Sequence, residues 1–224
     1  GTFPVFKGGL EPIQPKLAMP QGVKNETGKN GYFPNGNFTF TETFTGNSLD
    51  YRWVGVRGAR EGFISTTAEG LTITPYETNI KAVLPTSTLF YRQQHLNFTA
   101  TTTLKYVPRT EKDLAGITCY QSEKFNYVFG VTKKAEDSYI VLQRTEKGES
   151  STIACEKIEG NTPISLRVTA EGDKYTFSYS VKDNNYQTVG GTVSEDILST
   201  NVAGGFTGAM IGLYATTSND AEAL

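Results

Sequence analysis

The sequence is short of the residues that most metal-binding and catalytic sites use. It contains one histidine, His95, and two cysteines among 224 residues. A zinc site needs a cluster of His, Cys and carboxylate side chains at close spacing, and no such cluster occurs. A Ser-His-Asp triad would have to recruit His95, yet this residue stands at the start of a strand-like segment, and no Gly-x-Ser-x-Gly elbow precedes a helix-like one. These absences exclude zinc chemistry and argue against a hydrolytic triad.

An excess of one charge and long apolar runs are also missing. Lys and Arg number 21 against 23 Asp and Glu, which leaves a formal net charge of −2. The chain therefore has no strong field to attract nucleic acid. No run of about 18 or more apolar residues occurs, so we expect no membrane helix and no membrane partner. The cellular location stays open, with a periplasmic or secreted site favoured over a cytoplasmic one.

The two cysteines leave two interpretations open. Cys119 and Cys155 both fall in strand-like segments that can be neighbours, which would permit a disulfide. The alternative is a pair of small buried thiols. We favour the thiols, because a chain of this length can bury a core that needs no covalent staple.

The chain divides into an irregular start and a regular remainder. Residues 1–36 show no sustained period, which indicates a tail or linker. From residue 37 onward, short runs rich in Thr, Val, Ile, Tyr and Phe alternate with turn-forming residues, as in an all-β protein. We therefore expect a tail over 1–36 and one β domain over 37–224. The prolines of the tail are Pro4, Pro12, Pro15, Pro20 and Pro34.

The clearest strand spans residues 95–107 and alternates with period two. Every second residue from Leu96 to Tyr106 is apolar or Thr, and the residues between them are polar. One face of this strand should be buried, while the Thr-lined face can meet water or a shallow groove. Shorter segments repeat the pattern at 124–132, 138–145, 164–170 and 174–181.

The connections and the number of strands predict two facing sheets. Residues 171–173 and 183–185 are of types that tolerate positive φ and close hairpins. Residues 194–200 look helical for a turn or two, with Ser194 as N-cap. About a dozen strands would leave too much apolar surface exposed in one open sheet. We therefore expect an antiparallel two-sheet jelly-roll sandwich.

Residues 91–98 read Tyr-Arg-Gln-Gln-His-Leu-Asn-Phe. This segment resembles the Arg-Gln-Gln-His motif of the C-terminal concanavalin A-like domain of family 43 β-xylosidases. The resemblance covers about residues 38–216 and implies a concanavalin A-like sandwich. Further segments similar in kind and order lie at 50–53, 115–121, 125–127, 166–168, 175–180 and 206–215.

The resemblance also implies a partner. In that family the catalytic carboxylates lie on a five-bladed propeller N-terminal to the sandwich, so none of them would be carried by this chain. Residues 3–9 are similar to the stretch where such enzymes leave the propeller, so we expect the tail to come from the end of a missing propeller. The isolated chain should then be inert toward glycosides, and plant cell-wall oligosaccharides would be ligands of the whole enzyme.

Candidate site residues follow from the same resemblance. Phe206 matches an aromatic residue that some members lend to the rim of the sugar pocket, although it can also simply begin a core strand. The motif residues Arg92, Gln93, Gln94 and His95 can contact the propeller or a sugar, or can tie strand ends together through hydrogen bonds, which we favour.

Aromatic and acidic residues give further candidates. Trp53, Tyr120, Phe125 and Tyr127 could form a stacking platform for sugars, but in alternating strands at least half must point inward, so a core role is preferred. Calcium near Glu42 or Asp50 is the only cofactor considered.

Three functions from different classes remain. The preferred one is a non-catalytic accessory domain that packs on the propeller of a β-xylosidase or arabinofuranosidase and helps shape its sugar pocket. The second is an independent carbohydrate-binding module for xylan or arabinan oligosaccharides, which requires measurable affinity in the isolated chain. The third is a free-standing enzyme, which requires a carboxylate pair in one cleft with one member buried.

Overall fold

The computed structural model describes residues 39–46, 49–58, 62–159, 163–181 and 184–219. The chain divides into two units, residues 1–42 and 43–224, and every strand found in the described residues belongs to the second unit. The predicted tail over 1–36 lies outside the described residues. In the part that the structure describes, no helix is both long and apolar enough to cross a membrane.

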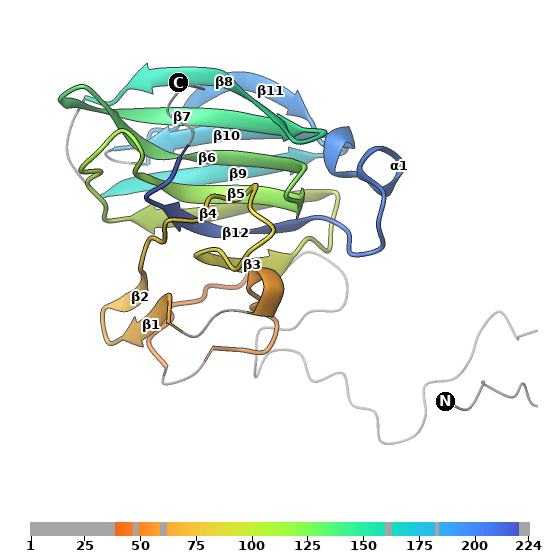
Figure 1. Ribbon diagram of the computed structural model, residues 1–224, viewed down its shortest axis with the longest axis horizontal. Coiled ribbons are helices and arrows are strands. Elements are labelled where there is room, and N and C mark those ends of the chain that lie inside the picture. The colour runs from red at the N-terminus through yellow and green to blue at the C-terminus, as the bar shows by residue number, and fades with distance from the viewer. Residues whose placement is uncertain (1–38, 47–48, 59–61, 160–162, 182–183, 220–224) are drawn as a thin grey trace, which may run out of the picture. The chain divides into compact units, whose positions relative to one another are not determined.

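Antiparallel pairing builds two main sheets that lie face to face (Figure 1). The larger sheet has the strand order β3-β12-β5-β6-β7-β8 and the smaller has the order β11-β10-β9-β4. A two-stranded ribbon, β1 (Ile64–Thr67) with β2 (Gly70–Ile73), stands apart from both. The strands of the larger sheet are β3 (Thr88–Arg92), β5 (Leu114–Ser122), β6 (Phe125–Lys134), β7 (Asp137–Glu146), β8 (Glu149–Lys157) and β12 (Met210–Thr216). Those of the smaller sheet are β4 (Asn97–Leu104), β9 (Ile164–Glu171), β10 (Lys174–Ser180) and β11 (Gln187–Ser194).

The chain passes from one sheet to the other four times. β3 lies in the larger sheet, β4 in the smaller, the meander β5 to β8 in the larger, and the meander β9 to β11 in the smaller. The last strand, β12, then returns to the larger sheet between β3 and β5. This architecture confirms the predicted concanavalin A-like sandwich.

The main core fills the space between the two sheets. Phe129 from the larger sheet packs on Phe177 from the smaller, with ring centroids 5.4 Å apart. Both rings are fully buried, as are Leu142 and Val168 beside them. Because each aromatic ring removes about 150–250 Å² of surface from water, this cluster is the chief source of cohesion between the sheets.

A second apolar cluster covers the outer face of the larger sheet. Val128, Val141 and Tyr214 point outward from their strands and pack with Ile80 of the preceding loop. The Tyr214 hydroxyl accepts a hydrogen bond of 2.9 Å from the Ile80 amide and so fixes that loop on the sheet. The central strands β5 and β6 of the larger sheet are therefore buried on both faces.

A pair of glycines lets two central strands approach closely. Gly116 of β5 faces Gly130 of β6. A Cβ atom on Gly116 would collide with the Phe129 carbonyl and with the backbone of Gly130. Any side chain here would push the strands apart, so glycine is required for close backbone contact rather than for a turn.

The local predictions agree with the structure in most places. β4 keeps the predicted alternation, and Glu171 to Asp173 close the hairpin between β9 and β10 with Gly172 at φ 63°. Leu96 was expected on the buried face but is 65% exposed, because β4 begins only at Asn97. Residues 194–200 form a 3-10 turn, η2 (Asp196–Leu198), and a separate one-turn α1 (Thr200–Ala203) capped by Ser199. The N-cap of η2 is Glu195 and not the predicted Ser194, although the Ser194 hydroxyl accepts a hydrogen bond from the Asp196 amide at 3.1 Å.

The two cysteines are not on neighbouring strands. Cys119 lies in β5 and points into the core between the sheets, whereas Cys155 lies in β8 and packs on the outer cluster. β6 and β7 stand between them, so the strands β5 and β8 lie about 14 Å apart, and the two side chains point to opposite faces of the sheet. This separation exceeds the reach of a disulfide. The favoured interpretation of two free thiols is confirmed.

Candidate functional site

The most exposed large apolar side chain named in the described residues is Phe206, whose exposed fraction is 104%. It lies in the loop of residues 204–209 between α1 and β12, which we call the Phe206 loop (Figure 1). Gly204, Gly205 and Gly208 have φ values of 72°, 74° and 70°. The interpretation of Phe206 as the start of a core strand is wrong, because β12 begins at Met210 and the glycines turn the loop outward.

Three carbonyl groups of this loop accept hydrogen bonds from the larger sheet. Arg92 Nη1 donates to the Thr207 carbonyl at 2.6 Å, and Gln121 Nε2 donates to the Gly204 carbonyl at 2.8 Å. The backbone amide of Gln93, the residue directly after β3, donates to the Ala209 carbonyl at 3.1 Å. The loop is thus tied at its start, its middle and its end, although the Phe206 ring itself is exposed.

A network of side-chain hydrogen bonds supports these three contacts. Gln93 Nε2 donates to Glu195 Oε1 at 2.6 Å, and the Tyr175 hydroxyl donates to Gln93 Oε1 at 2.6 Å. Burial holds the pKa of Tyr175 far above its usual range, so this phenol keeps its proton and remains a donor. The network joins β10 to the end of β3 and so connects the two sheets at the end that bears the Phe206 loop.

The remaining motif residues take different positions. Gln94 is exposed, and His95 is partly buried with its carbonyl accepting a hydrogen bond from Gln93 at 3.2 Å. Arg92 and Gln93 make the contacts expected of residues that tie strand ends together. Nothing in the sequence indicates this role for Gln121, Glu195 and Tyr175, because their hydrogen bonds join segments that are 82 to 102 positions apart.

The predicted aromatic platform does not form. Tyr120 is stacked on Phe90 in the outer cluster, at 5.1 Å between ring centroids, and Tyr127 is 1% exposed. Phe125 is buried as well, so the preferred core role is confirmed for these three residues. Trp53 is half-buried, with its ring 5.4 Å from that of Tyr91.

The outer face of the smaller sheet carries rows of hydroxyl groups. One row crosses all four strands through Thr99, Thr169, Thr176 and Thr192. The hydroxyl oxygens lie 3.5 Å apart in the first pair and 3.3 Å apart in the last. A second row runs through Thr101, Arg167, Ser178 and Thr188. This polar face contrasts with the apolar outer face of the larger sheet.

Two further features give this hydroxyl face shape. The Arg167 guanidinium stacks on the ring of Tyr186 at 3.4 Å, which creates a flat element among the hydroxyls. Next to the β9–β10 hairpin, an open hollow of about 640 Å³ is lined by residues that include Glu171, Lys174 and Thr176. Both Glu171 and Asp173 at this hollow are exposed, which is unlike the buried general acid of a glycosidase.

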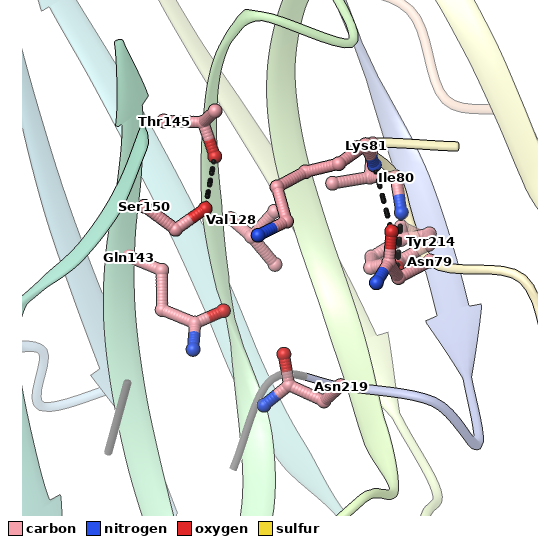
Figure 2. Close-up of a pocket in the computed structure, with 9 residues that line it drawn as sticks. All are labelled: Asn79, Ile80, Lys81, Val128, Gln143, Thr145, Ser150, Tyr214 and Asn219. Carbon is pink, nitrogen blue, oxygen red and sulfur yellow. Dashed lines mark hydrogen bonds between the residues drawn. The ribbon is translucent and has the colours of Figure 1, made fainter. Parts of the chain in front are cut away.

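A smaller pocket lies on the outer face of the larger sheet. Figure 2 shows Lys81, Gln143 and Asn219 around it, with the Thr145 and Ser150 hydroxyls bonded to each other at one side. Its volume is about 20 Å³, which is room for a water molecule and not for a sugar ring.

The residues considered for calcium are otherwise engaged or not gathered. Asp50 receives Arg52 Nε on one carboxylate oxygen and Nη2 on the other, both at 2.8 Å. This pairing holds the pKa of Asp50 below its usual value. Among the described residues, no group of three or more His, Cys, Asp or Glu lies close enough to hold a metal ion. Calcium thus remains a hypothesis without a defined ligand set.

The fold and the exposed aromatic loop define a sandwich domain of the concanavalin A-like class. The family model described as "Beta xylosidase C-terminal Concanavalin A-like domain" matches residues 41–223. The chain therefore belongs to this family of domains from the GH43 glycoside hydrolases.

Individual relatives are similar in the same region. A non-reducing end alpha-L-arabinofuranosidase, BoGH43B of Bacteroides ovatus, is 26% identical over 183 residues, which are 81% of this chain and 34% of that protein. A xylosidase/arabinosidase of Butyrivibrio fibrisolvens is 27% identical over 179 residues, or 79% of this chain and 34% of that protein. The chain spans about a third of the length of these curated relatives.

Solved structures agree with the fold. A GH43_12 protein retrieved from capybara gut metagenome superposes with a TM-score of 0.82 at 45% identity, over 96% of this chain and 42% of that one. The GH43 BlXynB protein of Bacillus licheniformis, at 21% identity, has a TM-score of 0.74 over 80% of this chain and 35% of that one. The second likeness concerns the fold alone.

Proposed function

We propose that this chain is a non-catalytic accessory domain of a GH43 glycoside hydrolase of the β-xylosidase or arabinofuranosidase type. It packs on the catalytic propeller and places Phe206 at the rim of the sugar pocket. The supporting observation is Phe206 itself. A fully exposed ring on a loop tied by three hydrogen bonds contributes nothing to the core of this domain, so its contact surface is available to another body.

The physical role of such a ring is to contact a sugar face and to exclude water. A pyranose or furanose ring presents C–H groups that pack on an aromatic face, and removing water strengthens the polar interactions of a neighbouring site. An aromatic contact of this kind is worth about 0.5–1.5 kcal/mol. Phe206 would therefore add affinity and shape to a pocket whose reacting groups belong to the propeller.

The test joins this chain to the remaining part of the GH43_12 protein from capybara gut metagenome, in place of that protein's own counterpart. Hydrolysis of aryl xyloside and aryl arabinofuranoside is then measured. We expect no turnover by the isolated chain, turnover by the chimera, and about a tenfold lower kcat/KM for the Phe206→Ala chimera. Val202→Ala, which removes an exposed apolar side chain from the neighbouring α1, is the matched control and should leave kcat/KM unchanged. An active isolated chain, or equal kinetics with and without Phe206, would contradict the proposal.

A second function is favoured by the hydroxyl face. The row of Thr99, Thr169, Thr176 and Thr192, the stacked Arg167 and Tyr186, and the adjoining hollow present hydrogen-bond donors and acceptors on a face that is partly open to solvent. Such a surface suits a neutral oligosaccharide such as those of xylan or arabinan, and would make the domain a carbohydrate-binding module. Calorimetric titration of the isolated chain with xylo- and arabino-oligosaccharides tests this function. Binding that is lost in Tyr186→Ala and kept in Phe206→Ala would support it, and silence in both titrations would leave the accessory role alone.

A further inference from the structure

The conformation of the Phe206 loop is set neither by packing of its aromatic ring nor by its glycine-rich backbone alone. The ring is fully exposed, so packing does not hold it. Gly204, Gly205 and Gly208 have backbone conformations that only glycine adopts without strain, and glycine-rich segments are by themselves flexible. Something outside the loop must therefore select one conformation.

Arg92 and Gln121 supply that selection. Arg92 reaches 115 positions along the sequence to the carbonyl directly after Phe206, and its charged donor makes a short bond of 2.6 Å. Gln121 reaches the Gly204 carbonyl, two residues before Phe206, at 2.8 Å. A Cβ atom on Gly205 would come within 3.1 Å of Gln121 Nε2, so the loop lies directly against this amide.

Gln121 is fixed by burial, whereas Arg92 is an exposed side chain that extends from a strand end held by its neighbour Gln93. Gln93, next to Arg92, is held by Glu195 and Tyr175 through bonds of 2.6 Å each. Gln121 is the last residue but one of β5 and is 8% exposed, so its side chain has little freedom. The loop is thus held by side chains at the ends of β3 and β5 rather than by other loops.

We propose that Arg92 and Gln121 are positioning residues, which hold the Phe206 loop in a single conformation so that the ring is preorganised for the sugar-bearing partner. This inference rests on the proposed accessory function. A loop that is ordered only on binding loses conformational entropy at that step, and the two hydrogen bonds to its backbone remove this cost in advance. Neither residue touches the substrate.

The first experiment measures loop order in this chain alone. 4-Fluorophenylalanine is placed at position 206, and the ¹⁹F transverse relaxation rate and the thermal midpoint are measured. We expect Arg92→Ala and Gln121→Ala each to lower the relaxation rate at least about twofold, since a freed loop gains nanosecond motion that averages the interactions of the fluorine nucleus. Arg92→Lys should restore most of the rate, because a lysine ammonium can donate to the same carbonyl. The matched control is Gln94→Ala, an exposed neighbour in the same motif.

The relaxation rates show whether Arg92 and Gln121 order the Phe206 loop or have no effect on it. If both alanine variants melt at the wild-type temperature and keep the wild-type rate, the inference is overturned. If Arg92→Ala lowers the thermal midpoint strongly, the relaxation rates of Arg92→Lys and Gln121→Ala are compared with the wild-type rate instead. A wild-type rate in Gln121→Ala would then overturn the inference.

The second experiment is a double-mutant cycle in the chimera described above. Arg92→Ala alone should lower kcat/KM about as much as Phe206→Ala, chiefly through KM, and should have no further effect once Phe206 is already alanine. A purely structural role would lower the activity equally in both backgrounds and would overturn the inference. The proposed function fails if Phe206→Ala has no effect, whereas the inference fails if Phe206→Ala has its effect and Arg92→Ala has none. The two failures are therefore distinguishable.

Discussion

The two sheets of the sandwich share one core but differ in the faces they turn outward. The larger sheet is covered on its outer face by Val128, Val141 and Tyr214 with the loop around Ile80, whereas the smaller sheet exposes rows of hydroxyls. The first behaves as the middle layer of a stack and the second as its open surface. A sandwich can therefore devote one sheet to stability and leave the other free to meet solvent or a ligand.

The difference has a clear signature in side-chain burial. β5 is buried at eight successive positions and β6 at eight, whereas β9 alternates between buried and half-buried residues. A strand covered on both faces has no polar side, so it reads as a nearly continuous apolar run. A strand covered on one face keeps the period of two.

The largest effect should come from the core that the two sheets share. Phe177→Ala removes a fully buried ring that packs on Phe129 and Tyr127 across the sandwich. We expect a loss of about 3–5 kcal/mol in the free energy of unfolding, measured by urea denaturation. A loss below about 1 kcal/mol would mean that the sheets do not depend on this contact.

Two reciprocal substitutions should distinguish the covered outer face of the larger sheet from the open outer face of the smaller sheet. Val141→Thr puts a hydroxyl into the covered face of the larger sheet and should cost about 1–3 kcal/mol, because the added group loses its water. Thr99→Val makes the opposite change on the open face of the smaller sheet and should stay within about 0.5 kcal/mol. Urea denaturation of both variants makes the comparison. Equal costs would contradict the distinction between covered and open faces.

The same distinction explains only part of what the sequence predicts. The alternation around β4 and in β9 is visible because one face is open, and the predicted segments of β4, β9 and β10 agree with the structure within a few residues. Those of β6 and β7 agree as well, although both strands belong to the covered sheet. The turn at Gly172 is visible because its residue types favour positive φ. Strand order is not visible, so Cys119 and Cys155 could be placed on neighbouring strands when two strands in fact separate them.

The candidate site was predictable only through its motif. Phe206 and the segment 91–95 carry the family resemblance, but nothing in their spacing shows that Arg92 reaches the carbonyl after Phe206. Gln121 and Glu195 join this site through side-chain hydrogen bonds that span 83 and 102 positions of the sequence. Their types, an amide and an acid near strand ends, are common in loops and give no local signal.

Alkaline pH should test the polar contact between the sheets. The Tyr127 hydroxyl of β6 donates to the Ser194 carbonyl at the end of β11, at 2.9 Å, and burial raises the pKa of Tyr127 to about 12. The unfolded value is about 10, so the folded state keeps its proton longer. This contribution is fully present below about pH 10 and is lost as pH rises toward 12. Tyr127→Phe should therefore make the fall in stability between these values shallower.

The control for this change is Tyr51→Phe. Tyr51 is 83% exposed, so its hydroxyl meets water in both states and the slope should match that of the wild type. Stability is followed by thermal unfolding at a series of pH values. An unchanged slope in Tyr127→Phe would show that other buried phenols, such as Tyr175, account for the alkaline loss.

The smallest effect concerns thiol reactivity and not stability. It should show whether the inner face of the larger sheet is covered more completely than its outer face. Cys119 points into the core between the sheets and is 0% exposed, whereas Cys155 lies half-buried under the outer cluster. Burial raises the pKa of both thiols, so each reacts slowly, but only Cys119 must wait for the sheets to separate. With a thiol reagent we expect one slow label on the native chain and a second only in denaturant. Cys155→Ser should abolish the native label, because the remaining thiol is reached only by global opening. Native labelling of Cys119 at the rate of Cys155 would mean that the core between the sheets opens as readily as the outer covering.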